Sequence, residues 1–277
     1  MSKSHWRHAQ GVLTFGAKPL LAGILNVTPD SFSDGGSLPT VDHALRRAED
    51  LLNAGAHLID LGGESTRPGA TAVSVDEELR RVIPVINAMH RRWPLTVISI
   101  DTCKAEVARQ AIEAGASIIN DVGGGRWDEN MLTVVTTSGA GYIATHSLDR
   151  HHRQTIPADA NPAVIVSDFL RNLSGRLIQL GVDPQRIIYD PGVGFGKTAE
   201  QNRQLLHAAP VWSGLERPLM WGISRKRFLA PDCLPADREP AARQIYRHLL
   251  TQEYPQIWRV HDVSASARSI ATHPASC

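Results

Sequence analysis

One repeated pattern restricts the fold of this sequence more than any other feature: a short apolar run that ends on a polar residue. The runs show no alternation of polar and apolar residues, which is typical of strands buried on both faces of a parallel sheet. The pattern occurs at residues 20–25, 57–59, 95–100, 117–119, 141–145, 187–189, 219–223 and 257–258.

Between most of these runs lie segments with the apolar spacing of amphipathic helices, at 41–54, 76–89, 104–114 and 162–180. Alternating strands and helices build βα units, and eight such strands predict a closed barrel, although an open doubly wound sheet also alternates. The chain has 277 residues, and one such barrel takes roughly 250. We therefore expect an α/β protein with a single (β/α)8 TIM-barrel domain over 1–277. Residues 1–16 would be an N-terminal extension and 268–277 a C-terminal tail.

Composition and charge exclude several classes of protein. The formal net charge of +1 gives no sign of a nucleic-acid or membrane-surface patch. No apolar run approaches the roughly 20 residues of a membrane helix, and residues 1–16 lack an apolar signal core. The three cysteines form no CxxC pair, and no HExxH or paired Cys/His spacing predicts structural zinc. We expect a cytoplasmic protein that binds neither nucleic acid nor membranes.

The polar residues that end the apolar runs form the candidate site. In such barrels the side chains at the carboxyl ends of the strands face one shared mouth. Polar residues also simply mark where strands meet solvent, but Ser, Lys or Glu would serve equally well there. The set is instead rich in Asp, Asn, Arg and His: Asn26, Asp60, Asp101, Asn120, Asp121, His146, Asp190, Lys226, Arg259 and His261.

Three of these residues suit one edge of a flat heterocycle. Asp101, Asn120 and Asp190 follow three different runs and offer fixed acceptors together with one amide. Lys226 is placed to donate to a ring carbonyl or a ring nitrogen.

A second group predicts an anion site. Arg259 and His261 are two apart on the last strand, so their side chains point the same way. Together with Asn26 from the neighbouring first strand they would bind an anion. An ordinary surface ion pair is the alternative interpretation of the Arg-x-His pair.

Glycine-rich segments follow several of the runs. Those at 28–36 and 62–70 predict loops that close over a substrate and exclude water, with plain connectors as the alternative. The segment 190–197 lacks the GxxxxGK[ST] spacing of a phosphate loop, which argues against a nucleoside triphosphate. Its glycines would let the backbone pass close to a ligand, with Phe195 as a wall.

At these residues the sequence resembles the dihydropteroate synthase family. The matching segments run in the family's order and span nearly the whole chain, and the first two are long and specific. They are GILNVTPDSFSDGG (23–36), GAHLIDLGGESTRPGA (55–70), SIDT (99–102), IND (119–121), DPGVGFGK (190–197), GISRKRF (222–228) and RVHDV (259–263).

The resemblance implies a barrel that joins 6-hydroxymethyl-7,8-dihydropterin diphosphate to p-aminobenzoate, giving 7,8-dihydropteroate and diphosphate. It implies a pterin pocket of Asp101, Asn120, Asp190 and Lys226, with Asp60 orienting groups nearby. It implies a diphosphate site of Asn26, Arg259 and His261, with Mg2+ on Asn26. It implies an aminobenzoate site among Phe32, Thr66, Arg67, Pro68, Phe195 and Ser224. The catalytic residues would be Asp101, Lys226 and Arg259.

The chemistry agrees with that assignment. Loss of diphosphate leaves a cation that is delocalised into the pterin ring. Catalysis then needs cations and Mg2+ for the leaving group and a carboxylate for the ring, for which Asp101 is the candidate. The amine is already nucleophilic, so no strong base is required.

The sequence departs from the family pattern in two regions. Thr145-His146-Ser147 stands where the family usually has Met-His-Met, and 229–256 lacks the usual small-residue helix. In the family that helix helps to form a dimer, so the homodimer that the resemblance implies would have a different sequence in this segment. Two alternatives remain at this stage: a pterin-binding methyltransferase domain, and a pterin-binding paralogue without turnover.

Overall fold

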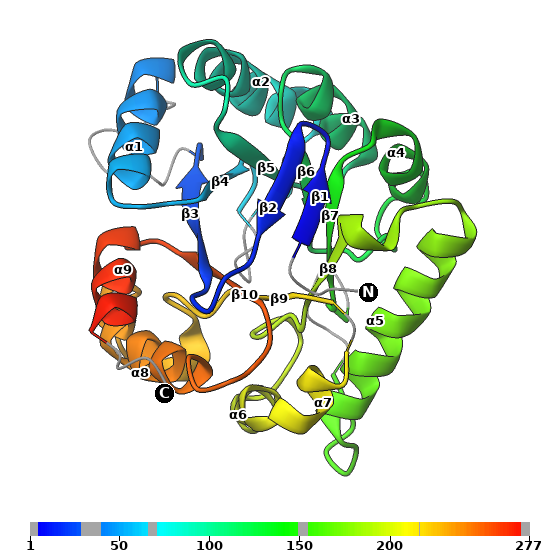
Figure 1. Cartoon of the computed structure of the whole chain (residues 1–277), viewed down its shortest axis with the longest axis vertical. Helices are drawn as coiled ribbons and strands as arrows, with labels where there is room; N and C mark the ends of the chain where they lie inside the picture. Colours follow the sequence, from blue (N-terminus) through cyan, green and yellow to red (C-terminus); the bar gives the residue numbers. More distant parts are fainter. Residues whose placement is uncertain (1–4, 29–39, 66–70, 149–154, 216, 273–277) are drawn as a thin grey trace.

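Eight parallel strands form a closed barrel in the computed structural model, which describes residues 5–28, 40–65, 71–148, 155–215 and 217–272. Their order around the barrel is β10-β3-β4-β5-β6-β7-β8-β9 (Figure 1). The predicted (β/α)8 barrel is therefore confirmed. The strands are β3 (Leu20–Asn26), β4 (Leu58–Gly62), β5 (Val97–Asp101), β6 (Ile118–Asp121), β7 (Gly141–Thr145), β8 (Ile187–Asp190), β9 (Leu219–Trp221) and β10 (Gln256–Val260).

Helices surround the barrel on its outside (Figure 1). In the described part of the chain no helix is both long and apolar enough to cross a membrane. The α-helices are α1 (Val41–Asn53), α2 (Val75–Arg92), α3 (Ala105–Glu113), α4 (Met131–Ser138), α5 (Pro162–Gln179), α6 (Ala199–His207), α7 (Ala209–Ser213), α8 (Glu239–Leu249) and α9 (Val263–Ala271). Short 3-10 turns lie at η2 (Pro184–Arg186), η3 (Arg227–Leu229) and η4 (Ala236–Arg238).

Local chemistry explains where several helices begin. Thr40 and Ser74 cap α1 and α2 by accepting hydrogen bonds from the peptide N–H groups of His43 and Glu77. Thr198 forms a reciprocal capping box with Gln201 at the start of α6. The four helices expected from periodicity are all present. The expected tail at 268–277 begins inside α9, which continues to Ala271.

The residues expected as an N-terminal extension contain a hairpin that packs on the barrel. It consists of β1 (His5–His8) and β2 (Gly11–Thr14), and Figure 1 shows it lying across the barrel. The Trp6 side chain is completely buried, and its indole N–H donates to the carbonyl of Arg186 at 3.0 Å. Because Trp6 packs in one cluster with Ile118 and Ile188, the hairpin closes the amino-terminal end of the barrel.

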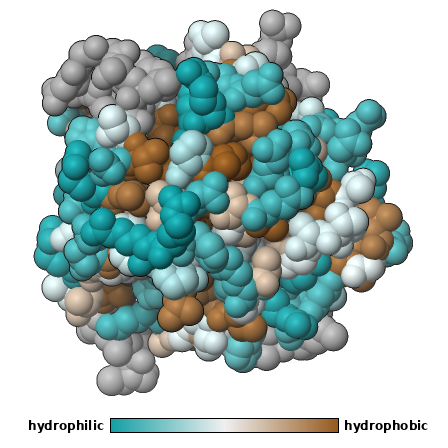
Figure 2. Space-filling model, turned by 90° about the horizontal axis from the view of Figure 1, so that it is seen from above, coloured by the Kyte–Doolittle hydropathy of each residue, from teal (hydrophilic) through white to brown (hydrophobic). Residues whose placement is uncertain are grey.

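Two apolar layers hold the domain together. The larger one lies between the strands and the helices. The smaller one fills the amino-terminal half of the barrel interior, where Leu58, Ile118, Ile143, Ile188 and Ile257 are fully or almost fully buried. Within the part of the chain that the structure describes, few large apolar side chains are exposed, Leu95 and Leu234 among them. On the face seen in Figure 2, hydrophobic residues lie in patches between hydrophilic ones.

Candidate active site

A ring of polar side chains lies directly above the inner apolar layer. Successive side chains of a strand point to opposite faces, so a residue two positions beyond an inward-facing one also faces inward. Counting two residues on from the apolar layer on five strands gives Asp60, Asn120, Thr145, Asp190 and Arg259. Strand register places Asp101 beside Asn120 and Thr145 beside Asp190. We call these six residues the polar ring.

Arg259 is the centre of the ion pairs in the polar ring. Its Nε contacts Asp60 Oδ2 at 2.5 Å and one terminal nitrogen contacts Asp101 Oδ2 at 2.6 Å. The Asn120 amide donates to the two oxygens of Asp60 at 3.2 and 3.1 Å. Arg259 was expected at an anion site, and the two carboxylates were expected at or near the flat heterocycle. The structure shows that these groups contact each other.

Several polar atoms of the ring are buried and have no hydrogen-bond partner among the described residues. They are Asp101 Oδ1, Asn120 Oδ1 and Thr145 Oγ1. A buried polar atom without a partner costs free energy, and native proteins leave few of them. A ligand with edge N–H groups would supply the missing partners. Thr145 was not among the predicted site residues, although its spacing of two from Ile143 could have indicated it.

Burial also perturbs the acids of the ring. It raises the pKa of Asp101 to about 7, against the opposite effect of Arg259. Burial likewise raises the pKa of Asp190, whose Oδ1 accepts the peptide N–H of Gly192 at 2.7 Å. Perturbed acids that gather in one place are typical of functional sites.

Lys226 lies beside Asp190 and against the Phe195 ring. Its ammonium is 3.9 Å from the ring centroid, and burial lowers its pKa to about 8 while Asp190 opposes that shift. A Cβ placed on Gly222 would lie 3.9 Å from both Asp190 Oδ2 and Arg259 Cδ. The Asp190 carboxylate and the Arg259 side chain therefore approach the same point, and Lys226 interacts electrostatically with both.

A glycine allows the loop after β8 to pass close to the strand before it. Gly192 has a φ of 68°, and a Cβ there would lie only 1.7 Å from the carbonyl oxygen of His146. The buried ammonium of Lys197 donates to the carbonyls of His146, Gly192 and Phe195. This packing fixes the loop that carries Phe195.

His261 and Ser224 meet at the other side of the mouth. Ser224 Oγ is 2.8 Å from His261 Nδ1 and donates to Glu239 Oε1 at 2.7 Å. The same Glu239 oxygen accepts from Arg225 Nε at 3.0 Å, and Arg225 has a φ of 61°. Glu239 was not expected here, because nothing in the sequence links α8 to the end of β9.

Two residues expected at the mouth lie elsewhere. Asp121 accepts from the peptide N–H groups of Gly123 and Gly125 and from the hydroxyl of Tyr142, so it fixes a turn. The His146 ring packs edge-on against Phe169 of α5, and burial lowers its pKa to about 2. Each directly follows an inward-facing residue, so its side chain points away from the barrel interior.

Of the remaining expected residues, one lies in the described part of the chain and four lie outside it. Asn26 ends β3, and its amide oxygen would lie 3.4 Å from a Cβ on Gly62, which would also be 3.7 Å from Asp101 Oδ2. Asn26 is therefore close to the polar ring. The residues Phe32, Thr66, Arg67 and Pro68 lie outside the described residues.

Comparison with known proteins identifies the class. A family model described as pterin binding enzyme matches residues 22–261, and the chain belongs to this family. Within it the chain is similar to dihydropteroate synthases. It is 41% identical over 258 residues to that of Bacillus subtilis (strain 168), covering 92% of this chain and 88% of the relative.

Solved structures of dihydropteroate synthases also match, and two of them serve as examples. One is from Clostridium difficile in the presence of pteroic acid, with a TM-score of 0.88 and 38% identity, covering 95% of this chain and 98% of the other. The other is from Xanthomonas albilineans with 4-aminobenzoic acid, with a TM-score of 0.88 and 38% identity, covering 98% and 97%.

Proposed function

We propose that this protein is a dihydropteroate synthase, which joins 6-hydroxymethyl-7,8-dihydropterin diphosphate to p-aminobenzoate and releases diphosphate. The observation that carries the proposal is the polar ring in the mouth of a pterin-family barrel, where Asp101 Oδ1 and Asn120 Oδ1 are buried acceptors with no hydrogen-bond partner among the described residues. The edge N–H groups of a pterin are the partners that these oxygens lack.

In the reaction the bond between the pterin methylene carbon and the diphosphate oxygen breaks, and its electron pair leaves with the diphosphate. The aminobenzoate nitrogen forms the new bond to that carbon and then loses a proton to solvent. Asp101 is the carboxylate that stabilises positive charge on the ring, and Lys226 donates to the ring next to Asp190. Asp60 holds Arg259 and Asn120 in place.

The leaving diphosphate would bind Arg259 and His261, which share the same face of the last strand and its extension. Arg259 then exchanges part of its pairing with Asp60 and Asp101 for the phosphate oxygens. His261 is held by Ser224 at 2.8 Å, which fixes the orientation of its ring. The Arg259 cation and a hydrogen bond from the His261 ring would both stabilise the negative charge that develops on the leaving oxygen.

Asn26 would hold Mg2+ together with the diphosphate. The described residues contain no cluster of three or more His, Cys, Asp or Glu side chains fit for a metal. One amide oxygen fits Mg2+ all the same, since that ion keeps several waters and takes its other ligands from substrate phosphates. When bound, Mg2+ would neutralise charge on the leaving group.

The aminobenzoate would lie among Phe195, Ser224 and the residues Phe32, Thr66, Arg67 and Pro68, which stay predictions because they lie outside the described residues. Phe195 already borders Lys226, and Ser224 borders His261, so both adjoin the proposed pterin and diphosphate sites. A homodimer also stays a prediction.

A coupled assay tests the proposal: diphosphate release must require both substrates. Asp101→Asn should lower turnover by roughly 100-fold or more, because the transition-state carboxylate is lost. Asp168→Asn, the same chemical change at an exposed site on α5, is the matched control. Pterin binding by the wild type without any diphosphate release would contradict the proposal and favour the paralogue without turnover.

A further inference from the structure

A chain of hydrogen bonds joins the first residue of α8 to the ring of His261. Glu239, which begins α8, accepts the hydroxyl hydrogen of Ser224 at 2.7 Å. Ser224 Oγ is in turn 2.8 Å from His261 Nδ1. The Glu239 side chain is 14% exposed, and Ser224 is buried. The proposed reaction gives Glu239 no role, yet one hydroxyl group connects its carboxylate to a residue of the diphosphate site.

The hydrogen bonds of the Ser224 hydroxyl determine where the proton of the His261 ring lies. A hydroxyl has one hydrogen to donate and two lone pairs that accept. A carboxylate oxygen only accepts, so the hydrogen points to Glu239 Oε1. The peptide N–H of His261 uses one lone pair, at 3.2 Å. The other lone pair faces His261 Nδ1, and that contact is a hydrogen bond only if Nδ1 carries a proton.

Arg225 supports the role of Glu239 as an acceptor. Its Nε donates at 3.0 Å to Glu239 Oε1, the same oxygen that accepts from Ser224. Arg225 makes this contact with a φ of 61°, which is uncommon for a residue other than glycine. Two donors on one oxygen suit a carboxylate, which accepts and does not donate.

Tyr246, two turns after Glu239, fixes α8 on the strand ends. Its hydroxyl lies 3.1 Å from the carbonyl oxygens of both Trp221 and Arg259. Its ring stacks on Trp258 of β10, with the ring centroids 4.6 Å apart. Residues seven apart lie on the same face of a helix, so this packing also directs Glu239 toward the end of β10.

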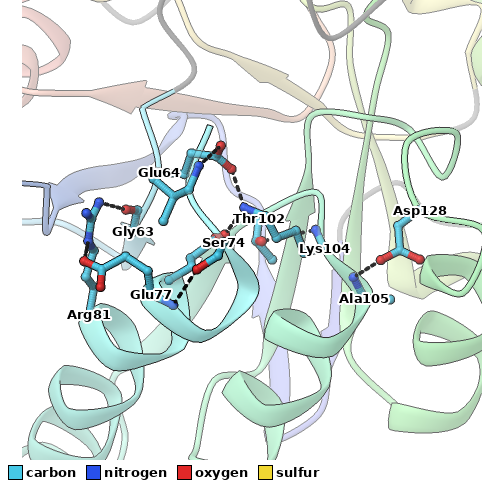
Figure 3. A network of polar contacts seen from close by, with 11 residues as sticks. Gly63, Glu64, Ser74, Glu77, Arg81, Thr102, Lys104, Ala105 and Asp128 are labelled. Carbon is cyan, nitrogen blue, oxygen red and sulfur yellow. Dashed lines mark hydrogen bonds and ion pairs between the residues drawn. The ribbon is translucent and has the colours of Figure 1, made fainter. Parts of the chain in front are cut away.

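The contacts of Glu239 lead to a different place from those of a further group of buried charges, shown in Figure 3. In that group Lys104 pairs with Glu64 at 2.5 Å and also with Glu78, and the peptide N–H of Ala105 donates to Asp128 at 2.8 Å. Those contacts join the end of β4, α2, the start of α3 and the loop after β6. The hydrogen bonds of Glu239 lead instead to His261, which the proposed function places against the diphosphate.

Cations outnumber acids on the elements around His261. The cations are Arg47 of α1, which donates to the His261 carbonyl at 2.9 Å, Arg225 and Lys226 after β9, Arg243 one turn along α8, Arg268 on the exposed side of α9, and Arg259 on β10. Asp262 caps α9, Asp60 and Asp101 pair with Arg259, and Asp190 lies beside Lys226. Nearby cations disfavour a second proton on the ring. Of these groups, Glu239 is the carboxylate that hydrogen bonds connect to Nδ1.

We propose that Glu239 is a positioning residue for the diphosphate of the substrate: through Ser224 it holds a proton on His261 Nδ1, so that the ring binds diphosphate as an imidazolium. A neutral imidazole carries one proton. With that proton on Nδ1, the opposite nitrogen Nε2 has only a lone pair, which repels a phosphate oxygen. A second proton on Nε2 makes the ring a cation that donates a charge-assisted hydrogen bond. This inference rests on the proposed function, which assigns the diphosphate to Arg259 and His261.

The pH dependence of substrate binding tests the proposal with Glu239→Gln, which keeps the volume and an acceptor for Ser224 but loses the charge. The imidazolium is present at low pH and is lost as the pH rises. An opposite charge within roughly 4–6 Å favours the charged form of a titrating group about tenfold or more. The KM for the pterin diphosphate, relative to a control, should therefore be nearly unchanged at pH 5.5 and about tenfold higher at pH 8.5.

Glu253→Gln, the same chemical change at an exposed position after α8, is the matched control. Both variants meet the same ionisation of the diphosphate, so the ratio of their KM values isolates the contribution of the protein. The Kd for 6-hydroxymethylpterin, which lacks the diphosphate, should differ by less than about threefold between them, because the polar ring keeps its contacts. An equal rise in KM at both pH values would overturn the proposal, and so would an unchanged KM at pH 8.5.

Nuclear magnetic resonance of the histidine ring nitrogens gives a readout without substrate. In the wild type the neutral His261 ring should carry its proton on Nδ1, and the ring should titrate at a higher pH than in Glu239→Gln. A neutral ring with its proton on Nε2 would overturn the positioning role alone. This measurement on the wild type decides the matter even if Glu239→Gln does not fold. A wild type with the Nδ1 proton but without synthase activity would refute the proposed function alone.

Discussion

Removal of Arg259 should destabilise the protein, and the cost should depend on pH. Arg259→Met leaves Asp60 and Asp101 as two buried carboxylates without their shared cation. Loss of one partner from a buried ion pair costs roughly 3–5 kcal/mol. The Arg259 side chain is 18% exposed, so water replaces part of its interaction. We expect a loss of about 3 kcal/mol in the free energy of unfolding at pH 8.

The pH dependence follows from the carboxyl pKa. Burial already raises the pKa of Asp101 to about 7, and removing the Arg259 cation raises it further. A carboxyl group whose folded pKa exceeds its unfolded pKa binds its proton more tightly in the folded state. Its folded state therefore gains stability as the pH falls and loses it as the pH rises through the folded pKa. The deficit of Arg259→Met should thus be smaller at pH 5.5 than at pH 8.

Urea unfolding followed by circular dichroism at both pH values measures this. The double variant Asp60→Asn/Arg259→Met removes one of the two buried carboxylates that lack a cation. Its loss of unfolding free energy should therefore be smaller than that of Arg259→Met alone. The coupling energy between the two sites should be at least about 1.5 kcal/mol. A deficit below about 1 kcal/mol at pH 8, or an equal deficit at both pH values, would refute the reasoning.

Three further predictions concern residues around the barrel. Trp6→Ala should lower the free energy of unfolding by about 3–5 kcal/mol, measured by urea unfolding, because a buried indole is lost. Both KM values should stay unchanged; a changed KM would show that the hairpin also affects the active site. Gly192→Ala should weaken 6-hydroxymethylpterin binding at least about tenfold by calorimetry, since its Cβ meets the His146 carbonyl; unaltered affinity would contradict this. Glu239→Ala should lower the unfolding free energy by about 1–3 kcal/mol, because the buried hydroxyl of Ser224 and the partly exposed guanidinium of Arg225 lose their acceptor; a neutral effect would argue against the contact.

The barrel could be predicted from the sequence because its strands are buried on both faces and leave continuous apolar runs. The same runs end on the polar residues that form most of the ring, and strand spacing of two gives their direction. That rule, applied strictly, would have excluded Asp121 and His146 and included Thr145. Asp121 and His146 were thus wrongly included because the prediction used the position of a residue at a strand end and ignored which face of the sheet its side chain is on.

Other features depend on contacts between distant segments and leave no local signal. The pairing of Arg259 with Asp60 joins residues 199 apart in the sequence, and the contact of Glu239 with Ser224 joins α8 to the end of β9. The hairpin around Trp6 has only four residues per strand, which is too short to show strand periodicity. These elements form because the barrel supplies their partners.

The most direct test of the central claim is a crystal structure of the protein with bound pteroic acid. The account predicts the pterin ring inside the mouth of the barrel, with Asp101 Oδ1 and Asn120 Oδ1 within hydrogen-bonding distance of its edge and Lys226 beside it. A ring bound away from these atoms, with Asp101 Oδ1 and Asn120 Oδ1 still without a hydrogen-bond partner, would contradict it.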